Sequence, residues 1–80
     1  MNLDDLRRRL VAEGVHPTAY DLDEKQRDEV YCLEGASSSW KYYYRERGIH
    51  RDEHFFRSGD AACRFLLDQI LRDPTTRVKR

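Results

Sequence analysis

The chain has no surplus of charge, no long apolar run and little glycine, proline or cysteine. Its 80 residues include 15 basic and 15 acidic side chains, so the formal net charge is zero. A general binder of nucleic acid or membrane surfaces needs an excess of positive charge, which this composition does not supply. No segment approaches the roughly 20 apolar residues of a membrane span. The N-terminal segment 1–6 is acidic where a secretion signal is basic. We therefore expect a cytoplasmic protein that binds neither membranes nor nucleic acid.

The motifs of common enzyme classes are also missing. There is no glycine-rich phosphate loop and no G-x-S-x-G. Cys32 and Cys63 lie far apart and lack C-x-x-C spacing. The simplest interpretation is two free, buried thiols of a cytosolic protein, and a disulfide between them is the alternative. So short a chain also has little room for a deep catalytic cavity. These features predict a protein that is not an enzyme and holds no cofactor.

One stretch, H-R-D-E-H at residues 50–54, has the H-x-x-E-H spacing of a class of zinc peptidases. A zinc site of that kind needs a helix, which brings both histidines to one side. Here the motif follows Gly48 and precedes an aromatic strand, and no third ligand of the expected kind comes after it. We interpret Arg51 and Asp52 as hairpin residues and His54 as the start of a strand. No metal site is therefore expected.

Helical periodicity marks both ends of the chain. The spacing of Leu3, Leu6 and Leu10 predicts a helix over about residues 3–13. Ser58 is a favourable N-cap for a second helix, whose apolar stripe ends before the Asp73-Pro74 pair. Between the helices the period falls toward two, which is typical of strands. The strand candidates are residues 19–22, 29–34, 40–47 and 54–57.

The order of elements predicts an α+β fold. We expect an antiparallel sheet of three or four strands, with the N- and C-terminal helices packed on one face, because each element has one apolar side to bury. Residues 1–73 then form a single domain, and residues 74–80 form a flexible basic tail.

Charge is segregated along this neutral chain. Acidic side chains outnumber basic ones around the first strands, whereas the region after Trp40 is basic. Exposed acids often serve only solubility, but an acidic patch also suits the basic cleft of a partner, since complementary charge raises the association rate. The candidate partner-binding acids are Asp23, Glu24, Asp28 and Glu29.

The aromatic strand carries more rings than one face of a sheet holds. If Trp40, Tyr42 and Tyr44 face the helices, Tyr43 lies outside, because side chains alternate along a strand. For Tyr31, on the neighbouring strand, the pattern likewise leaves open which face of the sheet the ring occupies. Such tyrosines either pack against cross-strand neighbours or serve as interface anchors. Tyr31 and Tyr43 are therefore candidate partner-binding residues.

Three motifs together resemble a known group of proteins. They are D-E-x-Y-x-L at residues 28–33, W-x-Y-Y-Y-x-E-R-G at residues 40–48, and F-x-S with A-C shortly after at residues 56–63. This pattern is similar to small actinobacterial-type immunity proteins, the partners encoded beside secreted polymorphic toxins. Gly59 departs from it, since an acidic residue is expected there. The resemblance implies a cytoplasmic protein inhibitor that blocks one cognate toxin enzyme. We expect that toxin to act on NAD or on nucleic acid, and we expect the inhibitor itself to be a monomer or weak homodimer.

Nucleic-acid binding is the main alternative. Helix, three strands, helix is the order of double-stranded-RNA-binding domains, and K-Y-Y-Y-R combines base-stacking with phosphate-binding residue types. Those domains carry a lysine cluster at the start of the last helix. This chain has Asp60 and a late Arg64 there, so a small nucleic-acid-binding or regulatory module remains the second hypothesis.

Overall fold

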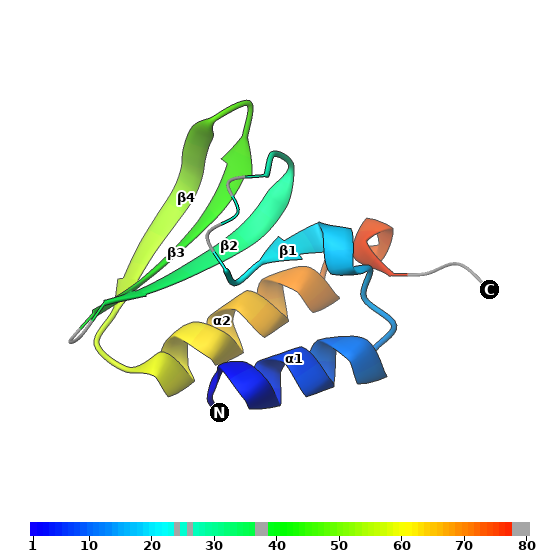
Figure 1. Cartoon of the computed structure of the whole chain (residues 1–80), viewed down its shortest axis with the longest axis horizontal. Helices are drawn as coiled ribbons and strands as arrows, with labels where there is room; N and C mark the ends of the chain where they lie inside the picture. The colour runs from blue at the N-terminus through cyan, green and yellow to red at the C-terminus, as the bar shows by residue number, and fades with distance from the viewer. Residues whose placement is uncertain (24, 26, 37–38, 78–80) are drawn as a thin grey trace.

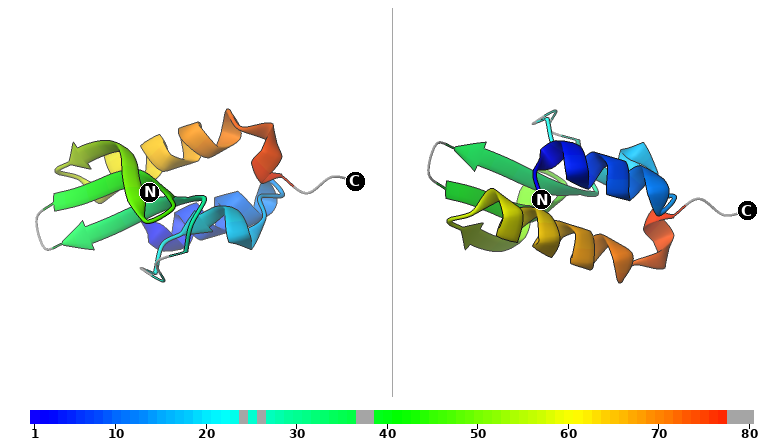
Figure 2. Two further views of the ribbon diagram at one scale, coloured as in Figure 1. Left: turned by 90° about the horizontal axis from the view of Figure 1, so that it is seen from above. Right: turned by 90° about the horizontal axis from the view of Figure 1, so that it is seen from below.

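A computed structural model describes residues 1–23, 25, 27–36 and 39–77 of the chain. It contains two α-helices, two short 3-10 helices and a four-stranded sheet with strand order β1-β2-β3-β4. The elements are α1 (Leu3–Ala12), η1 (Pro17–Ala19), β1 (Tyr20–Asp21), β2 (Val30–Ala36), β3 (Ser39–Glu46), β4 (Ile49–Phe56), α2 (Gly59–Leu71) and η2 (Pro74–Thr76). Both α-helices cover the same face of the sheet (Figure 1) and lie side by side (Figure 2). The predicted α+β layout is confirmed.

Local signals in the sequence set the helix boundaries. At the start of α1, Asn2 and Asp5 form a capping box, in which each side chain accepts a hydrogen bond from the other residue's backbone. The side chain of Ser58 accepts from Ala61 N at 3.3 Å and caps α2, as predicted. No helix in the part of the chain that the structure describes is long and apolar enough to cross a membrane.

The sheet is mixed, which corrects one feature of the predicted topology. Strands β2, β3 and β4 are antiparallel neighbours, but β1 pairs with β2 in parallel, with Tyr20 opposite Tyr31 and Asp21 opposite Cys32. Both strands therefore point the same way. A strand of two residues carries too little periodic signal to reveal its direction.

The hairpin between β3 and β4 turns earlier than predicted. Its two turn residues are Arg47 and Gly48, with φ of 52° and 76°, and positive φ at both positions is what a tight two-residue hairpin turn requires. The interpretation of Arg51 and Asp52 as hairpin residues is therefore wrong, because β4 begins at Ile49. Asp52 instead has φ of 55° and lies where the register between β3 and β4 shifts, at a β-bulge.

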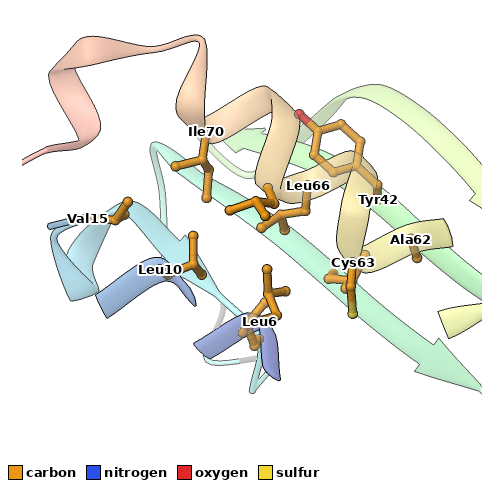
Figure 3. Packing of buried hydrophobic residues seen from close by; sticks show 11 residues of the cluster. Leu6, Leu10, Val15, Tyr42, Ala62, Cys63, Leu66 and Ile70 are labelled. Atoms are coloured by element: carbon orange, nitrogen blue, oxygen red, sulfur yellow. The ribbon is translucent and has the colours of Figure 1, made fainter. Parts of the chain in front are cut away.

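The main core lies between the helices and the sheet. Leu6 and Leu10 of α1, and Leu66 and Ile70 of α2, are fully buried there and meet side chains from the central strands (Figure 3). Tyr42 adds an aromatic contact to this core. Its ring packs edge-to-face against Phe65, with ring centroids 4.8 Å apart. Cys32 and Cys63 are both buried and both free, as predicted.

Trp40 packs into a slot between two glycines. It is partly buried against the main core. A Cβ on Gly35 would approach the indole to 2.8 Å, and a Cβ on Gly59 to 3.0 Å. Because real Cβ atoms essentially never come closer than 3.0 Å, Gly35 is needed to admit the ring, whereas a Cβ on Gly59 would make a tight contact that requires a small shift of the indole.

The folded domain extends past residue 73. Residues 74–76 form η2, Thr76 is buried, and His16 N donates to Thr76 O at 2.8 Å. Arg77 forms an isolated antiparallel bridge with Val15. The predicted tail therefore does not begin at residue 74, because this segment closes the end of the core beside α1. Residues 78–80 lie outside the described part of the chain.

Candidate partner-binding site

A hollow with acidic and aromatic walls lies where the start of β2, the end of β3 and η2 come together. Its volume is about 370 Å³. Its lining residues are His16, Thr18, Ala19, Asp28, Glu29, Tyr31, Tyr44, Asp73, Thr75 and Thr76. The hollow therefore gathers three carboxylates, two tyrosine rings and three threonines from distant parts of the chain. We call it the acidic hollow.

Two tyrosines form the aromatic wall of the acidic hollow. Tyr31 and Tyr44 face each other across β2 and β3, with ring centroids 4.9 Å apart and an edge-to-face angle of 68°. The Tyr31 hydroxyl donates to Asp73 Oδ2 at 3.0 Å. Burial and this bond to a carboxylate both raise the pKa of Tyr31. The phenol therefore stays protonated as a fixed donor across the ordinary pH range.

Asp73 is held by neighbours on both sides. Its Oδ1 accepts from the Thr75 hydroxyl at 2.6 Å and from Thr75 N at 3.0 Å, so it caps η2. The Thr75 hydroxyl, followed by the Thr75 amide and Tyr31, lowers the pKa of Asp73. This carboxylate is therefore a stable negative charge at the floor of the acidic hollow.

Asp28 and Glu29 share the acidic hollow but have different roles. Asp28 Oδ1 accepts from Gly48 N at 2.9 Å and from Arg45 Nε at 3.2 Å, which ties the loop before β2 to the hairpin turn. Glu29 is exposed and has φ of 59°, and its amide donates to Arg45 O at 2.6 Å. No ion pair involves the Glu29 carboxylate within the described residues. Asp28 thus positions the loop, and Glu29 presents its charge to solvent.

The other predicted acids lie elsewhere or outside the described residues. Asp23 does not line the acidic hollow. It pairs with Arg7 of α1 and lines a second hollow of about 390 Å³ beside Leu3 and Trp40. Glu24 lies outside the described residues. The structure therefore brings together Asp28, Glu29 and Tyr31 of the predicted set, and it places Asp23 apart from them.

Tyr43 lies on the predicted face of the sheet but is not an exposed ring. It is only 4% exposed. His50 stacks on it, with ring centroids 3.8 Å apart at 14°, and Lys41 Nζ lies 5.1 Å from its ring centroid. Its hydroxyl donates to Glu34 Oε1. The interpretation of Tyr43 as an accessible anchor is therefore wrong, because long side chains on that face cover the ring.

Two residues of the acidic hollow escaped the sequence analysis. Tyr44 was assigned only to the helix-facing side of its strand, and Asp73 only to the end of the second helix. The position of Tyr44 follows from its place directly opposite Tyr31 in the pairing of β2 with β3. Asp73 is 42 positions from Tyr31 in the chain, and no local pattern joins residues so far apart.

The H-x-x-E-H motif lies within β4, and the bulge separates its two histidines. His50 stacks on Tyr43, on the face away from the helices. His54 packs against Tyr42 and Phe65, on the helix-covered face. Within the described residues, no three His, Cys, Asp or Glu side chains are grouped closely enough to hold a metal ion.

The buried phenols and thiols predict a loss of stability in alkali. Burial raises the pKa of Cys32 from 9.0 to about 11 and that of Tyr42 from 10.0 to about 12. Each raised value means that the unfolded chain loses its proton before the folded one does. Stability from these groups is therefore complete below about pH 9 and falls as the pH rises toward about 12.

The measurement is urea unfolding followed by circular dichroism at several pH values between 8 and 12. We expect the midpoint to fall steadily above about pH 9. A Cys32→Ala variant should lose part of the fall between about pH 9 and 11 and keep the part that arises from tyrosine, which begins near pH 10. A midpoint unchanged from pH 8 to pH 11 would contradict the assigned burial.

Comparisons with known proteins found no similar protein: no family model, no curated protein and no solved structure matches this chain.

Proposed function

We propose that this protein is an immunity-type inhibitor, which binds a cognate secreted toxin enzyme in the cytoplasm and occludes its active site. The resemblance in the three aromatic and turn motifs suggests the class. The observation that carries the proposal is the acidic hollow, where Glu29 and Asp73 lie beside two tyrosine rings. On this proposal the protein is a binding module, with no catalytic role and no cofactor.

The chemistry of the acidic hollow suits a basic partner. An enzyme that acts on NAD or on a polynucleotide presents arginine and lysine to phosphate groups. Carboxylates can occupy the same positions without being consumed. Tyrosine rings beside the carboxylates add a surface on which a guanidinium group can stack. Arginine and lysine side chains around a partner's active site could therefore contact both carboxylates and tyrosine rings in the acidic hollow.

The test is protection of cells that express the toxin encoded beside this protein. Wild-type protein is expected to allow survival. The double variant Glu29→Arg, Thr18→Arg places two cations in the acidic hollow at exposed positions, so it should fold normally and lose protection. The matched control is Asp4→Arg, Ala12→Arg, which makes the same change of net charge at exposed positions of α1.

Two outcomes would count against the proposal. Full protection by the Glu29→Arg, Thr18→Arg variant would place the interface elsewhere on the molecule. Failure of the wild-type protein to protect, or to bind the purified toxin, would reject the inhibitor function itself.

RNA binding is the second candidate, and the fold supports it in one respect. The order α1, three antiparallel strands and α2, with both helices on one face, is shared with double-stranded-RNA-binding domains. However, the first turn of α2 carries Asp60, whose Oδ1 accepts from Arg64 Nε at 2.9 Å. A carboxylate at that position repels phosphate. Binding of duplex RNA at physiological salt would favour this candidate over the inhibitor.

A further inference from the structure

Among the described residues, strand β4 has no neighbouring strand on one side, so this edge of the sheet is open. It is the last strand in the order β1-β2-β3-β4, and every residue in it except Phe56 is exposed. Two large hydrophobic side chains on it face solvent, Ile49 at 57% and Phe55 at 71% exposure. An open edge with exposed apolar side chains is a template for pairing with another strand.

The backbone of β3 shows which groups of β4 point outward. Arg45 O accepts from Glu29 N, so the backbone groups of Arg45 are directed toward β2. Because these directions alternate along a strand, the backbone of Lys41 also points toward β2 and not toward β4. Phe55, which lies opposite Lys41, must therefore direct its own N–H and C=O away from β3. Glu53, at the β-bulge, and Arg57, directly after the last residue of β4, flank Phe55 on either side of the regular edge.

One antiparallel register makes this edge complementary to itself. With a two-fold axis at Phe55, the two Phe55 rings lie opposite each other, and Glu53 lies opposite Arg57 of the second copy. The ion pair then occurs twice, on the sheet face away from the helices. A two-fold axis at Glu53 or at Arg57 would set like charges opposite each other, which is destabilising. Charge therefore selects the register centred on Phe55.

Present contacts leave these side chains accessible for pairing. Arg57 is exposed and forms no ion pair within the described residues. Glu53 Oε2 lies 3.2 Å from Lys41 Nζ and 3.6 Å from His50 Nδ1, which are both neighbours on its own sheet, and its side chain stays 40% exposed. The bulge at Asp52 ends the regular edge on the other side. Regular pairing is therefore confined to residues 54–56, with Glu53 and Arg57 at its two ends.

We propose that this protein self-associates as a two-fold dimer through antiparallel pairing of its β4 edges, centred on Phe55, which would join two four-stranded sheets into one. The paired segment is short, and small interfaces fall in the weak class of association. The dimer should therefore form at high micromolar concentration and dissociate on dilution. The acidic hollow lies at the other end of β2 and β3 from Phe55, so this inference is independent of the proposed function.

Sedimentation equilibrium up to about 1 mM protein is the first test. Wild-type protein should show a reversible monomer–dimer equilibrium. Phe55→Glu should abolish the dimer, because it replaces the apolar pair with two facing carboxylates. Val11→Glu is the matched control, since Val11 is 69% exposed on α1, and it should leave the equilibrium unchanged. A wild-type protein that stays monomeric at 1 mM would overturn the proposal.

Charge reversal tests the register itself. Glu53→Arg and Arg57→Glu should each weaken self-association by about tenfold or more, since each sets like charges opposite each other. The double variant should regain the wild-type equilibrium, because both ion pairs are restored with reversed polarity. In addition, Phe55→Cys should form a disulfide-linked dimer on oxidation, because hydrogen-bonded antiparallel partners have Cα atoms about 5.5 Å apart. A dimer that is indifferent to these changes, or a double variant that stays monomeric, would disprove this pairing.

Discussion

Replacing Trp40 by alanine is expected to lower the free energy of unfolding by about 3–5 kcal/mol. The indole fills the slot between Gly35 and Gly59, so its removal leaves a cavity that glycine cannot fill. The domain is small, and such a loss is a large part of its total stability. Trp40 is the one tryptophan of the chain, so unfolding in urea should be followed by circular dichroism rather than fluorescence.

A double-mutant cycle tests whether the slot is the cause. Gly59→Ala should destabilise the wild-type protein, because the new Cβ would lie 3.0 Å from Trp40 Cζ2. In the Trp40→Ala background the same change should be neutral or stabilising, since alanine is a better helix former than glycine by about 1 kcal/mol. Val11→Ala, at an exposed position of α1, serves as the control and should change stability by less than about 0.5 kcal/mol. Equal costs of Gly59→Ala in both backgrounds would show that the indole and the glycine are not coupled.

The helices and the faces of the aromatic strand could be predicted from the sequence because local rules determine them. Leucine spacing and the Ser58 cap define the helices. Alternation correctly placed Trp40 and Tyr42 on the helix-covered face. Exposure was harder to predict, since it depends on which neighbours cover a ring. Tyr43 is buried by His50 and Lys41, which belong to two different strands.

Local sequence patterns could not predict the position of the β3–β4 turn or the full acidic hollow, and the reasons differ. Positive φ is rare for arginine, so Arg47 gives no turn signal, and only Gly48 marks the position. The acidic hollow joins the loop before β2 to η2, which are far apart in the chain. The segregation of charge along the sequence predicted Asp28 and Glu29, and the number of aromatic rings on the strands predicted Tyr31. It could not find Asp73, because that residue reaches Tyr31 only through the packing of α2 on the sheet.

Charge reversal at Glu29 is expected to slow association with the proposed toxin partner by about tenfold or more at low salt. Glu29 is exposed and has no ion pair within the described residues, so its charge is available to attract a cationic partner. Reversing it should act mainly on the association rate and should weaken the dependence of that rate on salt. The measurement is stopped-flow association of the purified proteins at several ionic strengths. Asp4→Arg, which makes the same change of charge on α1, is the control and should have a much smaller effect.

The Glu29→Gly variant separates the effect of the carboxylate charge from the effect of the backbone conformation. Glu29 has φ of 59°, a conformation that glycine adopts without strain. Glu29→Gly should therefore slow association while leaving the free energy of unfolding unchanged or slightly higher. Asp28→Ala should behave differently, because it leaves Gly48 N and Arg45 without their shared acceptor. We expect it to destabilise the fold by about 1–3 kcal/mol. If Glu29→Arg associates as fast as wild type at low salt, the acidic hollow does not face the toxin, whatever the stability of the variant.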